Sequence, residues 1–239
     1  MNEPFIDVEY FWGALQAVLP YVKVTLGLTL ASVVLGAILG LVCCLVEVRK
    51  VPVLSQLAKL YVLVCRSLPN MVLLYLVYYG VPILLMALSR EGNLPLHVEK
   101  VTALQIAVVG LTLHTGAYLT EIFRAAVQSI PAGQLEAAES IGMTWLQAYR
   151  RVILPQAAVF SLPLFANQFL STMKSTSIVF VITVIELFGA AKLYCEDNSQ
   201  YFEAYIAVAC IYWVMGVVFE FLFDRLELRL GRYKRGNVA

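Results

Sequence analysis

Residues 24–46 read VTLGLTLASVVLGAILGLVCCLV and contain no charged side chain. A helix needs about 20 mostly apolar residues to cross the hydrocarbon core of a bilayer, so this stretch is predicted to span a membrane. The whole chain fits this interpretation, because 61% of its 239 residues are hydrophobic and only 14% are charged. A water-soluble domain would need more polar surface. We therefore expect an all-α integral membrane protein in a lipid bilayer, and the net charge of +1 indicates no nucleic-acid partner.

Four further segments are long and apolar enough to span: residues 68–88, 101–120, 157–188 and 204–222. The segment 157–188 exceeds the thickness of a bilayer at about 1.5 Å per residue, so it must tilt strongly or break, either at Pro163 or around residues 174–177. Together the segments predict a polytopic protein with five transmembrane helices in a single membrane domain, residues 1–239. Before the first span, residues 10–21 are expected to form a short interfacial helix.

Positively charged residues follow the first, third and fifth spans, whereas the N-terminus is acidic and the other two loops carry mixed charge. Loops enriched in Lys and Arg stay on the cytoplasmic side of a membrane. This pattern predicts an N-terminus outside and a C-terminus inside. The basic residues are Arg49, Lys50 and Lys59, then Arg124, Arg150 and Arg151, and finally Arg225, Arg229, Arg232, Lys234 and Arg235.

The segment between the third and fourth spans, residues 129–156, lies inside by this charge argument. The tripeptide that ends at Pro131 suits a helix start, and Glu136 and Glu139 follow where acidic side chains favour the helix dipole. Gly142 permits a turn or a close approach by another backbone. We expect two short helices around Gly142 that project into the cytoplasm; the alternative is one amphipathic helix that lies on the membrane surface.

Part of this segment resembles a known signature. Residues 136–155 read EAAESIGMTWLQAYRRVILP, which is similar to the EAA motif of binding-protein-dependent ATP-binding cassette importers. The motif positions are Glu136, Ala137, Ala138, Gly142, Leu154 and Pro155, and the family usually has isoleucine where Val152 stands. Residues 114–138, HTGAYLTEIFRAAVQSIPAGQLEAA, resemble the polar amino acid permease branch, as does Arg66-Ser67-Leu68-Pro69, where that branch more often has Arg-Gly-Thr-Pro.

The resemblance implies the type I importer permease fold in a bacterial inner membrane, with the two short helices docked on a separate dimer of ATPase subunits. ATP and magnesium would be used by that partner, because this chain has no GxxxxGK[ST] phosphate loop, so no cofactor and no enzymatic activity are expected of it. An extracytoplasmic amino acid-binding protein is also implied. Five helices without an internal repeat indicate that a second permease subunit, identical or paralogous, completes the pathway.

Polar side chains interrupt the apolar background of the fourth span. An ionisable group at such a depth is unfavourable unless it faces a protein interior or a water-filled cavity. A polar stripe beside a helix break can offer donors to a zwitterionic solute, and packing between helices is the alternative role. Asn167, Ser171 and Lys174 share one helix face, Gln168, Ser171 and Ser175 form a neighbouring stripe, and Thr176 follows.

The third span could line the opposite wall of a pathway. Its candidates are His114, Thr115 and Tyr118, although a lone histidine is more often packed and hydrogen-bonded. Glu121 and Arg124, three residues apart near the inner end, are expected to pair with each other or with the partner subunit, as a gate or as a strut. No spacing of cysteines or histidines resembles a metal site.

The resemblance also bears on the substrate. Members that carry cationic amino acids have acidic residues at the positions of Gln168 and Ser175, where this chain has an amide and a hydroxyl. We therefore expect a neutral or zwitterionic polar amino acid, such as cystine or glutamine. The alternatives are a cationic substrate, or an acidic one paired with Lys174. A stand-alone secondary transporter, which needs ion-coupling carboxylates deep in the spans, is the rival from a different class, and no catalytic triad indicates a membrane enzyme.

Overall fold

The computed structural model describes residues 7–91, 100–196 and 199–235. Within these ranges all regular secondary structure is helical, and five helical runs are long and apolar enough to cross a membrane, which confirms the predicted fold class. The runs are Val8–Val48, Asn70–Arg90, Ala103–Gln128, Trp145–Ile182 and Tyr201–Leu230. The mixed-charge loop between the second and third predicted spans falls largely at residues 92–99 and lies outside the described residues.

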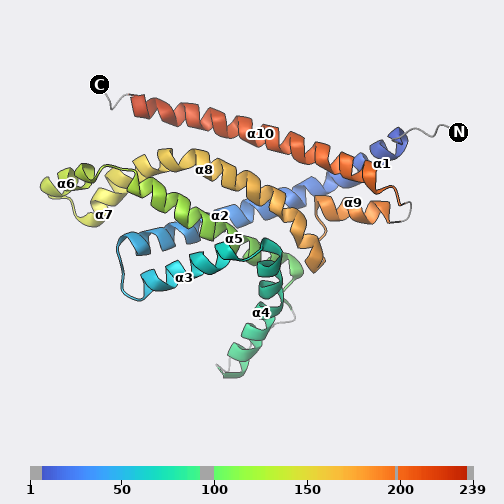
Figure 1. Ribbon diagram of the computed structural model, residues 1–239, viewed down its shortest axis with the longest axis horizontal. Helices are drawn as coiled ribbons and strands as arrows, with labels where there is room; N and C mark the ends of the chain where they lie inside the picture. The colour runs from blue at the N-terminus through green and yellow to red at the C-terminus, as the bar shows by residue number, and fades with distance from the viewer. Residues whose placement is uncertain (1–6, 92–99, 197–198, 236–239) are drawn as a thin grey trace.

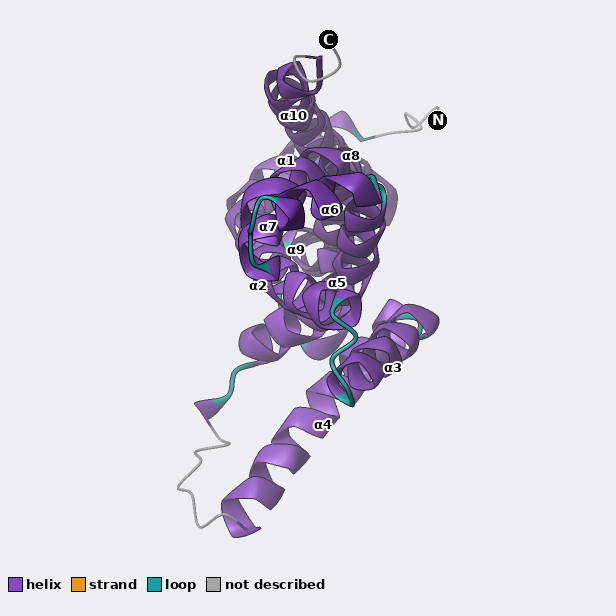
Figure 2. Cartoon of the chain, turned by 90° about the vertical axis from the view of Figure 1, so that its left-hand side faces the viewer, coloured by secondary structure: helices purple, strands orange, loops and turns teal. Residues whose placement is uncertain are grey.

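Helices α2, α5, α8 and α10 run roughly along the long axis of the molecule, whereas α4 projects from the bundle (Figure 1). Seen along that axis, α3 and α4 lie on the side opposite α10 (Figure 2). The bounds are α1 Val8–Val18, η1 Leu19–Tyr21, α2 Val22–Val48, α3 Leu54–Ser67, α4 Asn70–Glu91, α5 Ala103–Gln128, α6 Ala132–Ser140, α7 Trp145–Ala148, η3 Tyr149–Ile153, α8 Leu154–Ser175, η4 Thr176–Ile182, α9 Leu187–Cys195 and α10 Tyr201–Arg235.

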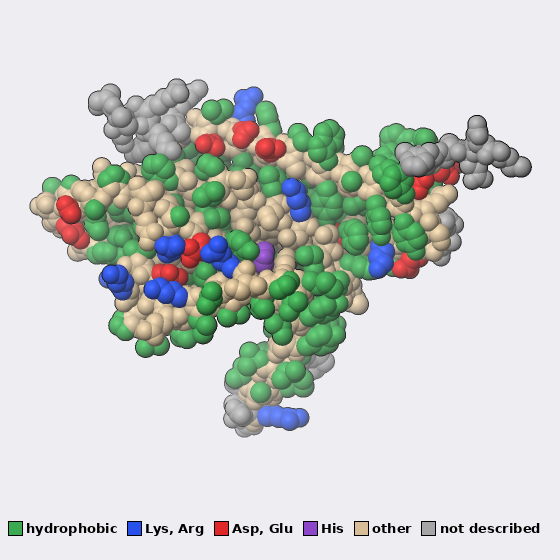
Figure 3. Space-filling model, in the orientation of Figure 1, with side chains coloured by type: hydrophobic (Ala, Val, Ile, Leu, Met, Phe, Trp, Pro, Cys, Tyr) green, Lys and Arg blue, Asp and Glu red, His purple; other side chains and the backbone are tan. Residues whose placement is uncertain are grey.

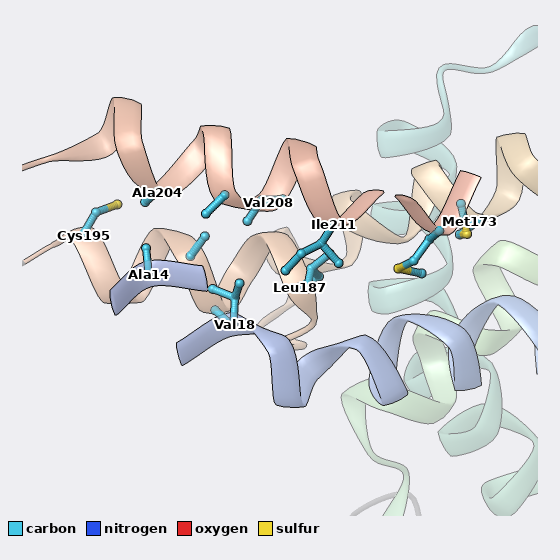
Figure 4. Packing of buried hydrophobic residues seen from close by; sticks show 12 residues of the cluster. Ala14, Val18, Met173, Leu187, Cys195, Ala204, Val208 and Ile211 are labelled. Atoms are coloured by element: carbon cyan, nitrogen blue, oxygen red, sulfur yellow. The ribbon is translucent and has the colours of Figure 1, made fainter. Parts of the chain in front are cut away.

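The expected interfacial helix is α1, and one of its faces packs against α9 and α10 while Val8 and Trp12 remain exposed. Asp7 caps it by accepting a hydrogen bond from the backbone N–H of Tyr10 at 3.0 Å. Ala14 and Val18 are completely buried against α9 and α10, in a cluster that Figure 4 shows in close-up. Pro20 allows a single 3-10 turn, after which the chain continues directly into α2. The first membrane run is therefore longer than the charge-free stretch suggested.

Helices α2 and α5 pack so closely that their backbones are in contact, because glycines face each other there. A Cβ atom at Gly40 would lie 2.9 Å from the backbone nitrogen of Thr120, and one at Gly36 would lie 3.1 Å from that of Gly116. Gly36 and Gly40 form a GxxxG pattern, which is typical of close helix crossings in membranes. This crossing sets the position of the central helix α5.

The fourth predicted span, residues 157–188, is wrong at its C-terminal end. Helix α8 passes through Pro163 without ending, and continues as the 3-10 segment η4 only from Thr176. Thr183 then adopts a left-handed φ of +67°, the chain turns back, and Glu186 caps α9. The proline is tolerated because neighbouring groups in a helix bundle can satisfy the freed carbonyl. Of the two predicted break sites, the second is therefore the one used.

Helix α3 was not predicted, because its apolar residues are interrupted by polar ones and it is shorter than a span. Pro69 ends the extended link that follows it, so α4 begins at Asn70, two residues after the predicted start of the second span. Most large apolar side chains of α4 are exposed, for example Ile83 at 63% and Tyr79 at 62%. Within one protomer α4 therefore has a surface that only lipid or another protein chain can cover.

The close contact of α2 and α5 predicts that the stability of the fold depends strongly on side-chain size at Gly40. Gly40→Ala should destabilise the fold by about 1–3 kcal/mol, because the new methyl group meets backbone atoms that cannot move aside. Gly27→Ala, on the same helix with no atom within 4 Å of its Cβ position, should be neutral. Thermal unfolding of the two purified variants in detergent measures the difference, and equal midpoints would contradict this account of the crossing.

Candidate functional site

The polar residues of the fourth span border a hollow on one face of α8. Asn167, Ser171 and Lys174 are exposed there, with Ser175 beside them. The hollow has a volume of about 400 Å³, and Leu170 and Ile178 complete its lining. Spacings of three and four residues place these side chains on one helix face, as the sequence predicted. We call this depression the polar hollow; it offers amide, hydroxyl and ammonium groups to a ligand.

Gln168, Thr115 and Thr176 do not line the polar hollow. Gln168 is buried, and its Nε2 donates to Thr172 Oγ1 at 3.4 Å. Thr115 on α5 shares a 3.0 Å hydrogen bond with the same Thr172 hydroxyl. Thr176 is fully buried and donates to the Met173 carbonyl at 2.8 Å. All three side chains are buried, and the Thr115–Thr172 bond connects α5 to α8, which is a packing role of small polar residues in membranes.

A second depression, of about 560 Å³, lies between α3 and α5. Tyr118 lines it, and the guanidinium of Arg66 lies 5.3 Å from the centre of the Tyr118 ring, within cation–π distance. His114 is one turn away, with its ring 4.9 Å from that of Tyr118. It is half-buried, and its Nδ1 has no hydrogen-bond partner among the residues that the structure describes. His114 itself is not part of the lining.

Glu121 is the centre of an ion cluster beside this depression. Arg124, on the same helix, donates to both Glu121 oxygens, and Arg66 Nη1 lies 3.8 Å from Glu121 Oε2. The predicted pair thus forms within one protomer, and Arg66 adds a link from α3 to α5. Lys59 also lines this depression. In the described part of the chain, no three His, Cys, Asp or Glu side chains converge as metal ligands would.

Sequence reasoning missed a third hollow, of about 340 Å³, which also borders Lys174. Phe188, Tyr205 and Tyr212 contribute its aromatic walls. The rings of Phe188 and Tyr205 are stacked, with centroids 5.5 Å apart and planes 11° apart. The sequence could not reveal this aromatic hollow, because Phe188 was assigned to the fourth span. The chain reversal at Thr183 places Phe188 in α9 instead.

The segment with the EAA sequence forms two short helices, α6 and α7, joined at Gly142. That glycine has a φ of +82°, which L side chains rarely adopt, so the turn requires it. Ala138 is buried and anchors α6, whereas Glu136 and Ala137 are exposed on its outer side. The π-helical segment η3 follows α7, and Leu154 and Pro155 then open α8. The hairpin and the polar hollow therefore belong to the two ends of one continuous helix.

The hairpin is rigidly attached and has an apolar tip. The guanidinium of Arg49, at the end of α2, lies 4.3 Å from the centre of the Trp145 ring, and that ring stacks on Tyr149 at 3.9 Å. Ile141 and Leu146 are 75% and 68% exposed, respectively. Neighbouring apolar side chains that remain exposed beside polar ones are typical of a contact surface for another protein.

Comparison with known proteins identifies the relatives of this chain. The profile of a family described as "Binding-protein-dependent transport system inner membrane component" matches residues 32–232. The probable amino-acid permease protein YxeN of Bacillus subtilis (strain 168) is 41% identical over 227 residues, 95% of this chain and 97% of that protein. The probable amino-acid ABC transporter permease protein PatM of Vibrio harveyi is 39% identical over 89% of this chain and 91% of that protein. The L-cystine transport system permease protein TcyL of Bacillus subtilis (strain 168) is 34% identical over 95% of this chain and 93% of that protein.

Solved structures agree with these sequence matches. A chain from the crystal structure of an amino acid ABC transporter with histidines superposes with a TM-score of 0.79 at 31% identity, covering 95% of this chain and 100% of that one. A chain of the MetNI methionine ABC transporter in an inward-facing conformation superposes with a TM-score of 0.74. At 19% identity, over 94% and 99% of the two chains, the second match supports the fold alone.

Proposed function

This chain belongs to the family of binding-protein-dependent transport system inner membrane components, and on that premise we propose that it is the permease subunit of an ATP-driven amino acid importer. Family membership makes it a multi-pass inner-membrane transport subunit and not an enzyme, and the ATPase is a separate chain. The observation that carries the amino acid assignment is the 41% identity to a probable amino-acid permease over 95% of this chain. The polar hollow around Lys174 supports it.

Two permease subunits, identical or paralogous, would enclose the pathway, and an extracytoplasmic binding protein would deliver the amino acid. The open hollows and the uncovered apolar face of α4 support a second subunit. The α6–α7 hairpin would dock on the partner ATPase, which uses ATP and Mg²⁺. The exposed tip at Ile141 and Leu146, with Glu136 and Ala137 beside it, supports that docking. A rigid contact of this kind can pass a rigid-body motion to α8.

Disturbing the hairpin turn should uncouple the complex. Gly142→Val forces a β-branched residue into a left-handed conformation, so we expect co-purified ATPase and ATP-driven uptake to fall about tenfold or more, while membrane insertion is retained. Gly133→Val, on α6 with open space around its Cβ position, serves as the matched control. Tagged wild-type and variant chains purified from native membranes give the comparison. Wild-type uptake that survives ATP depletion, or a wild-type chain without ATPase, would favour a stand-alone transporter.

We propose that the hairpin end of the molecule faces the cytoplasm. The hairpin and the C-terminal end of α10 lie toward one end of the molecule, and the start of α1 lies toward the other (Figure 1). Lys and Arg side chains gather together with Asp and Glu side chains in the half that carries the hairpin (Figure 3). Such enrichment in basic residues is typical of the cytoplasmic side.

Thiol labelling tests this orientation. In a variant without native cysteines, Ile141→Cys should be protected from an impermeant thiol reagent on intact cells. It should react after lysis and removal of the bound ATPase, because its side chain is 75% exposed in the isolated chain. Val8→Cys, at the opposite end and 61% exposed, should react on intact cells when the cell wall and any outer membrane are permeable to the reagent. Labelling of the Ile141 position on intact cells would place the hairpin outside and contradict the coupling proposal.

The favoured substrate is a neutral or zwitterionic polar amino acid, such as cystine or glutamine. Lys174 offers one cation for a carboxylate, while Asn167, Ser171 and Ser175 supply uncharged donors and acceptors. Among the residues that the structure describes, no carboxylate lines the polar hollow to pair with a cationic side chain. Relatives named as L-cystine permeases, at 34% and 35% identity, support cystine among these candidates.

A carboxylate introduced into the polar hollow should alter charge selectivity. Ser175→Glu should raise the uptake of L-arginine relative to L-glutamine about tenfold, because it adds a counter-charge at the lining. Gln168→Glu, on the buried side of α8, should lower the yield of folded protein without such a shift. Uptake by the reconstituted complex measures both ratios. An unchanged ratio for Ser175→Glu would remove the polar hollow from the pathway, and preferential uptake of L-arginine or L-glutamate by the wild type would favour a cationic or an acidic substrate.

A further inference from the structure

We propose that the aromatic hollow formed by Phe188, Tyr205 and Tyr212 receives the side chain of the transported amino acid, and that Glu186 holds the walls of this hollow in position. The inference rests on the proposed import of amino acids and adds a substrate class to it. The preferred side chain is bulky and weakly polar, such as one that contains sulfur.

Lys174 borders both the polar hollow and the aromatic hollow. Asn167 and Ser171 line the polar hollow on one side of it, while Ser177 and the aromatic residues line the other. A bound amino acid has its carboxylate and its side chain on the same carbon atom, so the two groups diverge from one point. A carboxylate paired with Lys174 can therefore leave the ammonium group over the polar hollow and direct the side chain into the aromatic one.

The lining of the aromatic hollow is selective by its chemistry. Apart from Lys174 at its edge, its lining residues are uncharged: aromatic rings, Ser177, Val208 and Ala209. Sulfur atoms make favourable contacts with aromatic rings, and apolar atoms gain from leaving water. A long amide or a charged side chain would lose hydrogen bonds to water there without equal replacement. The hollow thus favours a thioether side chain, such as that of methionine, over the amide of glutamine.

Glu186 is a buried carboxylate that caps the N-terminus of α9. It is completely inaccessible to solvent, and no cation lies within salt-bridge distance among the described residues. Its Oε1 accepts hydrogen bonds from the backbone N–H groups of Phe188 at 2.9 Å and Gly189 at 3.0 Å. Its Oε2 accepts from the hydroxyls of Tyr212 at 2.8 Å and Thr25 at 3.2 Å. Four donors and the N-terminus of α9 together compensate the buried charge.

Two residues that form walls of the aromatic hollow, Phe188 and Tyr212, are therefore hydrogen-bonded to the same carboxylate. Phe188 is held through its backbone, and Tyr212 is held through its hydroxyl, so neither can shift without breaking a bond to Glu186. The Tyr212 hydroxyl also lies 3.4 Å from that of Thr176, which directly follows Ser175 of the polar hollow. Glu186 is thus a positioning residue: it touches no substrate, and it fixes the aromatic walls relative to Lys174.

Filling the aromatic hollow tests the site. Ala209 lines it and is exposed, so Ala209→Phe occupies the space without crowding the protein core. Cys210, the next residue, is also exposed but is not part of the lining, so Cys210→Phe is the matched control. Initial rates of ATP-driven uptake of L-methionine and L-serine are measured in vesicles that contain permease, ATPase and binding protein.

The wild type should take up L-methionine faster than L-serine. Ala209→Phe should lower the ratio of the two rates about tenfold, because a large side chain loses its pocket and a small one does not. Cys210→Phe should leave the ratio unchanged. Equal ratios in the three proteins, or faster uptake of L-serine by the wild type, would overturn the assignment and would suit a hollow filled by a lipid chain. Failure of the wild type to import any amino acid would overturn the proposed function itself.

A second pair of variants separates positioning from simple stability. Tyr212→Phe removes the hydroxyl that donates to Glu186 but keeps the ring, so the KM for L-methionine should rise several-fold while the maximal rate changes less. Glu186→Ala should raise this KM further, and Glu186→Gln, which retains an acceptor for the α9 backbone, should restore part of the effect. A fall in maximal rate with an unchanged KM in these variants would make Glu186 a purely structural residue and overturn its assignment as a positioning residue.

Discussion

The contact between α2 and α5 at Gly36, Gly40 and Gly116 is the constraint on which the rest of the structure depends. Lipid provides no hydrophobic force that would push two membrane helices together, so their association relies on close packing and on polar contacts. Here the absence of side chains lets the two backbones approach until only van der Waals distance separates them. Helix α5 then presents Thr115 to α8, and the hydrogen bond to Thr172 aligns the helix that carries the polar hollow.

Helix α8 connects the two parts of the proposed transport mechanism. Its 22 residues extend over roughly 33 Å at about 1.5 Å per residue, from the α6–α7 hairpin to Ser175. A movement imposed at Gly142 can therefore reach the polar hollow without passing through a flexible joint. The Arg49–Trp145 contact fixes the hairpin to the end of α2, so the same movement also acts on the glycine crossing.

Because α8 ends at Ser175, the aromatic hollow can form beside the polar hollow. A straight helix would have carried Phe188 out of the membrane along the same axis, and no aromatic wall would face Lys174. The turn at Thr183 leaves backbone N–H groups at the start of α9, and Glu186 accepts two of them while it binds α2 and α10. A buried charge is maintained because it satisfies donors from three elements at once.

The sequence by itself determined the number of membrane spans, the all-α class and the hairpin around Gly142, because hydropathy, chain length and a required glycine act locally. It also placed Asn167, Ser171 and Lys174 on one helix face, since helical periodicity fixes the direction in which each side chain projects from the helix axis. Only the tertiary structure decided which way Gln168 points, since that depends on the neighbouring helices of α8. The same holds for the GxxxG contact and for the cluster at Glu186, whose partners lie up to 162 residues away in sequence. Pairings over such distances depend on how helices pack, and no local pattern in the chain encodes them.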